Sequence, residues 1–329
     1  MVTHRLRDHL PLLGDVIRLP AISVLMPVYN SQRYVARAVE SILDQTFKDF
    51  ELVIVDDGST DRSLEILRTY AARDRRIRLT TRPNRGISPT RNELLRQARG
   101  ALIAPMDSDD VALPCRLARE AAFLGEHPEV VCIGGSYRII DEADRLIHRG
   151  FPVAEHDEEI QRLMLVGHCS LHQPTVMYRH AAAQEVGGYD ERMPVAEDMD
   201  LWLRLGEVGK LANLPEPVLD YRVHANSVSD RMQQTALIEI RRACERAWKR
   251  RGITGTVEVM PWRASEHADS RHEFFVRFGW WAFNSGQRRT AGIYALRAIG
   301  ALPLGAMGWR LLACAVLKRA SFPTGIDER

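Results

Sequence analysis

At 329 residues and 45% hydrophobic content, with a net charge of +2, the chain can bury a full core and is long enough for two or three structural units. It contains no run of eighteen uncharged apolar residues and no convincing signal-peptide core, so we expect neither a membrane-spanning helix nor a secretory leader. Five widely spaced cysteines without a CxxC pair argue against a disulfide framework or a zinc site and favour reduced thiols in the cytoplasm.

Charge is distributed unevenly along the chain. Residues 231–329 contain 17 Lys and Arg against 8 Asp and Glu, whereas residues 1–230 contain 28 against 35. An acidic first part and a basic end indicate different partners, and the candidates for the basic end are anionic lipid, nucleic acid or another polyanion. A solvated arginine-rich surface is the alternative for most of these residues.

Strands and helices alternate over the first hundred residues, after a leader at 1–20 that we expect to be loosely attached. Short apolar runs bounded by turn residues predict strands, and apolar residues spaced by three and four predict helices. The expected strands cover 21–26, 50–55, 77–80 and 101–104, and the expected helices cover 34–43, 63–72 and 89–97. This alternation predicts a doubly wound, mostly parallel sheet with right-handed crossovers.

Polar side chains follow three of these strands. Tyr29 comes after the first strand, Asp57 after the second and the turn 107–109 after the fourth. Ligands of such sheets bind at the carboxyl ends of the strands, so we expect an aromatic ring and two acidic loops to meet at one rim, with Arg91 nearby. Alternatively, Tyr29 is a packed strand-end aromatic and Asp57 caps a helix.

Three carboxylates, Asp107, Asp109 and Asp110, lie within four positions. Like charges at this density repel each other unless a cation lies among them, and Mg²⁺ or Mn²⁺ prefers carboxylate oxygens. The chain has no glycine-rich phosphate loop of the dinucleotide-binding or P-loop type, so a metal is the expected partner for phosphate charge. The alternative is a solvated acidic turn before the helix that starts near Pro114.

The region 116–228 predicts a second set of elements. The expected helices cover 117–124 and 181–185, and the expected strands cover 130–136 and 175–178. Another helix opens at Glu197-Asp198, with an apolar stripe of Leu201, Trp202 and Leu205. Acidic residues stabilise a helix N-terminus on electrostatic grounds, so capping is an alternative to catalysis for this pair.

The basic end of the chain predicts helices at 233–250, 274–283, 291–302 and 306–318. Aromatic and aliphatic side chains lie beside Arg310 and Lys318 there, as in a helix that binds at a membrane surface. The alternative is a small helical bundle that packs on the rest of the chain or on a second subunit, which leaves a homo-oligomer open.

Several blocks of sequence share an order and spacing that is specific to one family. They are VLMPVYN (24–30), SILDQTF (41–47), ELVIVDDGSTD (51–61), Arg91-Asn92, DSDD (107–110), PCRL (114–117), VGGYD (186–190) and AEDMDLWLR (196–204). Together they resemble the family 2 glycosyltransferases, inverting enzymes of GT-A fold with a DXD-type motif. The resemblance covers roughly residues 21–228.

The resemblance implies an α/β fold, a GT-A-like doubly wound, mostly parallel sheet flanked by helices with a C-terminal helical extension. It implies a nucleotide-sugar-binding half at 21–115 and an acceptor-binding, catalytic half at 116–228, followed by the extension at 229–329. The implied nucleotide-sugar site consists of Pro27, Tyr29, Asp57, Arg91, Asp107, Ser108 and Asp109. Asp109 is the implied ligand of a divalent metal, Asp198 matches the general base, and His224 is a further candidate near the metal or the diphosphate.

The implied reaction is an inverting, metal-dependent transfer of a sugar from a nucleoside-diphosphate sugar, with uridine favoured as the base, to a hydroxyl of a glycan, lipid-linked or other acceptor. Its setting would be cell-surface polysaccharide, glycan or glycolipid synthesis in the cytoplasm, with peripheral contact to the inner face of the membrane through 274–319. No nucleic-acid partner is expected. Two alternatives are a nucleotidyltransferase that makes a nucleotide-sugar and a non-catalytic module that binds a sugar nucleotide.

Overall fold

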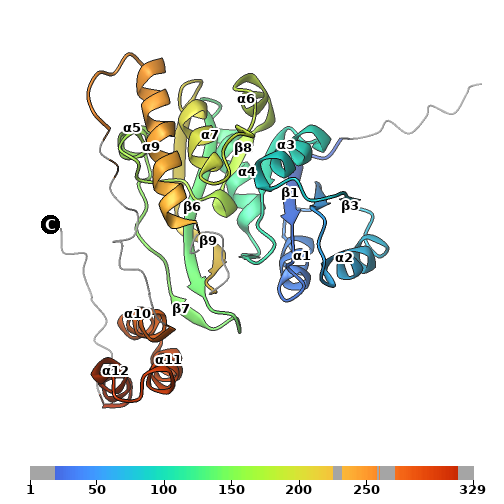
Figure 1. The fold of residues 1–329 in the computed structure, drawn as a ribbon. Coiled ribbons are helices and arrows are strands. Elements are labelled where there is room, and N and C mark those ends of the chain that lie inside the picture. The colour runs from blue at the N-terminus through green and yellow to red at the C-terminus, as the bar shows by residue number, and fades with distance from the viewer. Residues whose placement is uncertain (1–18, 225–231, 258, 260–270, 318–329) are drawn as a thin grey trace, which may run out of the picture.

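The computed structural model describes residues 19–224, 232–257, 259 and 271–317 (Figure 1). The expected leader therefore lies outside the described residues except at 19–20. The strands are β1 (Ile22–Val28), β2 (Phe50–Asp56), β3 (Ile77–Thr81), β4 (Leu102–Pro105), β5 (Val111–Ala112), β6 (Val130–Ile140), β7 (Leu146–His148), β8 (Met177–Arg179) and β9 (Lys210–Arg222). The helices are α1 (Val35–Leu43), α2 (Ser63–Ala71), α3 (Ile87–Gln97), α4 (Arg116–Glu126), α5 (Asp157–Leu165), α6 (His180–Glu185), α7 (Glu197–Leu205), α9 (Gln233–Arg250), α10 (Arg271–Asn284), α11 (Arg288–Ala301) and α12 (Ala306–Leu317), with a short 3-10 turn at Gln173–Thr175.

The strands form one sheet in the order β3-β2-β1-β4-β8-β6-β9-β5, and β7 pairs with β6. The pairs among β1, β2, β3 and β4 are parallel, and β6 is parallel to β9. Because β8 and β5 run antiparallel to their neighbours, the sheet is mixed rather than uniformly parallel. The expectation of a doubly wound, mostly parallel sheet flanked by helices is confirmed.

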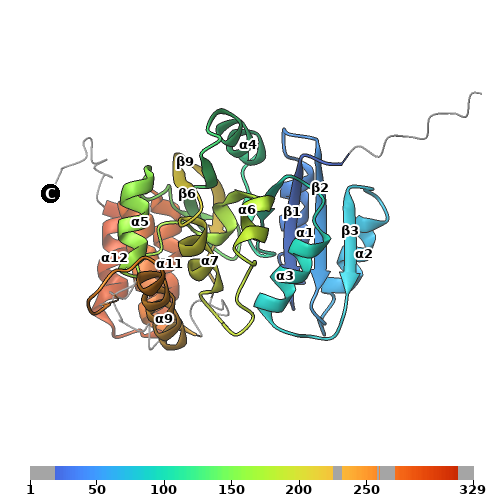
Figure 2. The same cartoon turned by 90° about the horizontal axis from the view of Figure 1, so that it is seen from above.

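Burial explains why the first half folds in this way. All seven residues of β2 are buried, as expected for a parallel strand covered on both faces. Figure 2 shows α2 and α3 beside the β1–β3 end of the sheet and α5, α7 and α9 beside the other end. With these helices on its faces, the sheet leaves the carboxyl ends of β1, β2 and β4 as a common rim.

Helix α7 is anchored in the core of the second half. Leu201, Trp202 and Leu205 are fully buried, so the predicted apolar stripe is confirmed. Helix α9 packs beside α7 through Ala243, Cys244 and Ala247. This packing fixes the N-terminal turn of α7 relative to the sheet. The expected division of the chain at 115/116 stays a prediction, because one sheet runs through both parts.

The expected C-terminal helices are present over the described residues. Helices α10, α11 and α12 pack against one another, and α10 and α11 also contact β7 (Figure 1). Trp281 of α10 lies edge-on to Phe151, with their ring centroids 5.6 Å apart. Within the described part of the chain, no helix is long and apolar enough to cross a bilayer.

A fully buried ion pair lies behind the rim. Arg116 and Glu120 of α4 both have side chains with no exposed surface, and Arg116 Nε lies 3.2 Å from Glu120 Oε1. Arg116 Nη2 also donates to the carbonyl oxygens of Pro105 and Val176, which joins the end of β4 to the residue before β8. Burial raises the pKa of Glu120 to about 7, although Arg116 partly offsets the effect.

This pair predicts a pH dependence of stability. Since the pKa of folded Glu120 lies above its ordinary value, the folded state binds the proton more tightly, and the free energy of unfolding should fall as the pH rises between about 4.5 and 7. In the wild type the free energy of unfolding should fall by about 3 kcal/mol between acid and neutral pH because of Glu120, and Glu120→Gln should abolish this fall. Urea unfolding at pH 5 and pH 8 measures it. Glu126→Gln, at an exposed position of the same helix, should retain the wild-type decline, and parallel curves for Glu120→Gln and wild type would refute the assignment.

Candidate active site

The acidic turn at 107–110 connects two strands. It follows β4 and leads into β5, whose Val111 pairs with Asp220 of β9. The side chains of Asp107 and Asp109 are 30% exposed, whereas Asp110 is buried. Two carboxylates therefore face outward from a turn that is fixed at both ends.

Asp109 and His224, the two residues named as candidates near a metal, lie together. Asp109 Oδ2 is 3.0 Å from His224 Nε2, and His224 lies just beyond the end of β9. A carboxylate and an imidazole are suitable ligands for Mn²⁺, and a partly exposed pair leaves coordination positions for diphosphate oxygens. Among the described residues no group of three His, Cys, Asp or Glu side chains could hold a metal ion by itself.

Hydrogen bonds from Arg222, the last residue of β9, hold the acidic turn in place. The backbone N–H of Arg222 donates to Asp110 Oδ1 at 2.8 Å, and Arg222 Nε donates to the carbonyl oxygen of Asp109 at 2.7 Å. Asp110 Oδ2 is buried and has no hydrogen-bond partner. Burial raises the pKa of Asp110 well above its ordinary value, and the charges of Asp109 and Asp107 add to the effect. Arg222 partly offsets that repulsion, and a further cation beside the turn would relieve more of it.

Arg91 joins the two acidic clusters. Its side chain is 11% exposed, and its guanidinium donates to Asp107 Oδ1 at 3.3 Å and to Glu197. The guanidinium also lies 5.7 Å from the ring centroid of Tyr189. Burial opposes the charge on Arg91, but Glu197 and Asp107 outweigh it and raise its pKa. A charged Arg91 therefore links the turn after β4 to the first residue of α7.

Asp198 is the second residue of α7, next to that ion pair. Ala196, just before the helix, has a φ of 60°, an uncommon conformation for a residue with a side chain. Asp198 Oδ1 accepts the backbone N–H of Met199 at 2.8 Å, so the predicted helix-end role is present as well. Burial raises the pKa of Asp198. Burial also raises the pKa of Asp107, and the charges of Asp109 and Asp198 add to that effect. The structure thus brings Asp198 and the acidic turn into one electrostatic site.

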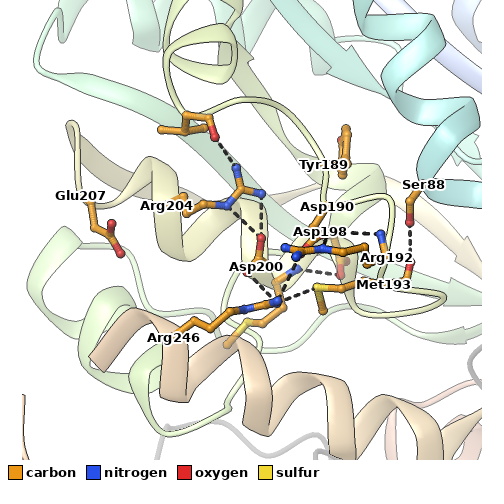
Figure 3. Close-up of polar contacts among 12 residues, drawn as sticks. Ser88, Tyr189, Asp190, Arg192, Met193, Asp198, Asp200, Arg204, Glu207 and Arg246 are labelled. Atoms are coloured by element: carbon orange, nitrogen blue, oxygen red, sulfur yellow. Dashed lines mark hydrogen bonds and ion pairs between the residues drawn. The ribbon is translucent and has the colours of Figure 1, made fainter. Parts of the chain in front are cut away.

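Other ion pairs fix the far side of α7. Asp200 accepts from Arg204 at 2.8 Å and from Arg246 at 3.0 Å, and Arg246 also contacts Asp190 (Figure 3). The carboxylates of Asp200 and Asp190 are therefore held in structural ion pairs. Asp198, which is partly exposed, does not take part in them.

Asp57 lies at the rim, but the protein already engages both of its oxygens. Oδ1 accepts from Arg82 and from the backbone N–H of Arg85, and Oδ2 accepts from the N–H of Gly86 at 3.0 Å. Asp57 therefore shapes the loop after β3. Since a carboxylate oxygen can accept more than one hydrogen bond, the contact of Asp57 with a nucleobase stays a prediction.

Tyr29, Pro27 and Ser108 complete the rim. Tyr29 is 52% exposed at the end of β1, which argues against a packed strand-end aromatic and leaves its ring open to stacking. Pro27 lines a small cavity together with Arg91, Asp107 and other residues. Ser108 is buried, and its Oγ lies 2.6 Å from Ser31 Oγ, so it ties the β1 loop to the acidic turn.

Sequence reasoning missed Arg82, Arg222 and the role of Glu197. Arg82 directly follows β3, so the rule that located Tyr29 and Asp57 could also have found it. Arg222 ends β9, a strand that was not predicted. The contact between Arg91 and Glu197 joins residues 106 positions apart, and no local pattern could have indicated it.

Comparisons with known proteins agree with the resemblance. The family model of Glycosyl transferase family 2 matches residues 23–187. The putative glycosyltransferase EpsE of Bacillus subtilis is 35% identical over 213 residues, which is 63% of this chain and 74% of EpsE. The O-antigen biosynthesis glycosyltransferase WbnJ of Escherichia coli is 32% identical over 213 residues, 64% of this chain and 82% of WbnJ. Chondroitin synthase of Escherichia coli is 31% identical over 214 residues, but the chain spans only 30% of its length.

Solved structures share the fold at lower identity. S. aureus TarS 1-349 in complex with UDP-GlcNAc has a TM-score of 0.57 and 19% identity, over 89% of this chain and 90% of that chain. The mannosyltransferase PcManGT from Pyrobaculum calidifontis, in complex with GDP-Man and Mn²⁺, has a TM-score of 0.53 and 16% identity, over 94% and 84%. These likenesses confirm the GT-A-like fold. The family model, and the two relatives whose length the match covers by 74% and 82%, establish that the chain belongs to glycosyl transferase family 2.

Proposed function

We propose that the chain transfers a sugar from a nucleoside-diphosphate sugar to an acceptor hydroxyl with inversion, in a metal-dependent reaction. The observation that carries this proposal is the bridge formed by Arg91. It joins Asp107 of the acidic turn to Glu197, the neighbour of Asp198, so that a donor-binding turn and a candidate base share one site.

The donor is proposed to be a UDP-sugar that lies across the carboxyl ends of β1, β2 and β4. Tyr29 would stack on the base, Pro27 would frame it, and Asp57 would accept its N–H through a free lone pair. Arg91 and Asp107 would contact the diphosphate and the sugar. TarS has been solved with UDP-GlcNAc and PcManGT with GDP-Man, so both uridine and guanosine donors occur among the structural neighbours.

Asp109 and His224 would hold Mn²⁺ or Mg²⁺. Ser108 would keep the acidic turn in place through its contact with Ser31 in the loop after β1. When bound, such a metal stabilises the negative charge that develops on the departing diphosphate. Arg91 is only 11% exposed and cationic, and it would add to this stabilisation from the side of α3.

Asp198 is proposed as the general base. The acceptor oxygen forms a bond to the anomeric carbon while the bond from that carbon to the β-phosphate oxygen breaks, and the hydroxyl proton passes to Asp198. Because the attack comes from the face opposite the leaving group, a single displacement inverts the configuration. The raised pKa of Asp198 makes it a stronger base than an ordinary Asp, and Glu197 is unsuited to the role because Arg91 neutralises it.

The acceptor is proposed to be a hydroxyl of a cell-surface glycan or of a lipid-linked precursor. Chondroitin synthase and an O-antigen biosynthesis enzyme are among the relatives, and both names refer to polysaccharides. All five cysteines are free thiols, which supports a cytoplasmic setting.

Two alternatives predict different products. A nucleotidyltransferase would release pyrophosphate from a nucleoside triphosphate, whereas the proposed enzyme releases a nucleoside diphosphate. A non-catalytic binding module would release neither. Family membership argues against the first, and the joint presence of Asp107, Asp109 and Asp198 at one site argues against the second.

Thermal shift measurements with and without Mn²⁺ test the donor and the metal together. A ligand that binds only the folded state stabilises it by about 2.7 kcal/mol at a hundredfold excess over its Kd. We expect UDP with Mn²⁺ to raise the Tm more than UDP alone, and more than the other nucleoside diphosphates with Mn²⁺. A larger shift with GDP would change the assigned base. Equal shifts with and without Mn²⁺ would contradict metal-dependent donor binding.

A further inference from the structure

The turn between α11 and α12 exposes a cluster of apolar side chains. Leu304 is 96% exposed and Trp309 is 54% exposed, and Leu302 and Met307 are exposed beside them. Trp309 Nε1 donates to the carbonyl oxygen of Pro303 at 2.9 Å, so the polar atom of the indole is satisfied within the turn. We call Leu302, Leu304, Met307 and Trp309 the apolar tip. Figure 1 shows α10–α12 at one end of the molecule, away from α1–α3.

The exposed side of α12 continues this surface. Val316 and Leu317 near its C-terminus are 63% and 80% exposed, and Arg310 is the only charged residue of the helix. Monomeric proteins rarely leave contiguous apolar surface of this kind in contact with water. The apolar tip and α12 therefore form a surface suited to an apolar partner.

The surroundings of the tip are strongly basic. Residues 271–317 contain six Arg and one Glu, without Asp or Lys. A groove of about 600 Å³ lies between α10 and the end of α11, lined by Arg271, His272, Phe275, Arg297 and the 300–302 segment. The Arg297 guanidinium lies 5.9 Å from the ring centroid of Phe275, which holds its charge at the groove wall. Leu302 belongs both to the groove lining and to the apolar tip.

We propose that this surface binds an anionic phospholipid bilayer, with the apolar tip in the interfacial layer and a lipid phosphate in the groove of Arg271 and Arg297. An exposed apolar cluster that includes a Trp and lies beside basic residues is typical of proteins that bind at the membrane surface without crossing it. Basic side chains near an anionic leaflet add electrostatic attraction to this binding. The proposal does not depend on the sugar-transfer chemistry.

Charge argues against a second copy of the chain as the partner. A two-fold symmetric contact would place the same patch against itself. Arg271, Arg297 and Arg310 would then meet an identical set, and like charges at an interface repel. An anionic bilayer provides both the apolar layer and the opposite charge.

Vesicle co-sedimentation of the full chain tests the proposal. We expect the wild-type protein to sediment with vesicles of phosphatidylcholine and about one-third phosphatidylglycerol, and to bind vesicles of phosphatidylcholine alone at least about tenfold more weakly. The double variant Leu304→Glu and Trp309→Glu should lower the partition coefficient on anionic vesicles by about tenfold or more. Because both side chains are exposed, the variant should keep the wild-type Tm. Arg271→Gln with Arg297→Gln should reduce the preference for anionic vesicles.

The control is Ile238→Glu, which places one such charge at an exposed apolar position of α9. It should bind vesicles as wild type does. Equal binding of wild type and the Leu304→Glu, Trp309→Glu variant would overturn the proposal, as would wild-type binding that is indifferent to lipid charge. If size-exclusion chromatography instead found a wild-type dimer that this variant dissociates, the surface would belong to a second copy and the membrane assignment would fall.

Discussion

Replacing Asp198 with Asn is expected to lower kcat for sugar transfer by about 10²–10⁴-fold, while the affinity for the donor with Mn²⁺ changes little. The amide keeps the shape of the carboxylate but cannot accept the proton of the acceptor hydroxyl. It can still accept the N–H of Met199 through its oxygen, so the start of α7 should remain in place. Transfer assays combined with donor titration calorimetry separate the two effects.

The pH profile of the same pair of proteins adds an independent readout. Since burial raises the pKa of Asp198, the wild-type kcat should fall as the pH decreases through a value above that of an ordinary Asp. The residual activity of Asp198→Asn should lack this acidic limb. The control is Glu158→Gln, which removes an exposed acidic residue from the first turn of α5 and should leave both kcat and its pH profile unchanged. Equal loss of donor binding and transfer in Asp198→Asn would contradict the assignment of a base.

Replacing Asp109 with Asn is expected to lower both the affinity for the donor and the rate of sugar transfer, unlike the change at Asp198. Asp109 contributes the carboxylate that would share the metal with the diphosphate, and His224 alone provides a neutral ligand without charge. We expect the extra Tm shift given by Mn²⁺ in the presence of UDP to disappear, and kcat to fall by about 10²–10³-fold. Thermal shift and transfer assays at increasing Mn²⁺ concentration measure both.

The control for this change is Asp44→Asn, at an exposed position after α1 and away from the acidic turn. It should keep the wild-type response to Mn²⁺. An Asp109→Asn protein that retains the full Mn²⁺-dependent shift would show that the metal is held elsewhere or is not used.

The sheet and the rim could be predicted because each depends on local signals. Runs such as Phe50–Asp56 are apolar over most of their length, which identifies buried parallel strands, and polar residues directly after them lie at the binding edge of such a sheet. Strand β9 gave no such signal. It contains Pro215, Pro217 and two acidic residues, and its pairing with β6 has register shifts next to Pro217, so tertiary contacts override a sequence that disfavours a strand.

The contacts that organise the site could not be predicted in the same way. Asp57 was expected at the rim, but its ion pair with Arg82 depends on β2 and β3 lying side by side. The bridge from Arg91 to Glu197 depends on α3 and α7 approaching across the sheet. Family resemblance predicted which residues to expect at the site, and only the folded arrangement indicates which of them neutralise one another.

The most direct test of this account is a crystal structure of the protein with UDP-sugar and Mn²⁺. The account predicts Mn²⁺ at about 2.1 Å from a carboxylate oxygen of Asp109 and from diphosphate oxygens. It also predicts that Asp198 faces the anomeric carbon from the side opposite the diphosphate, with room for an acceptor oxygen at about 3–3.5 Å from that carbon. A metal bound away from Asp109, or an Asp198 side chain on the same side as the leaving group, would contradict it.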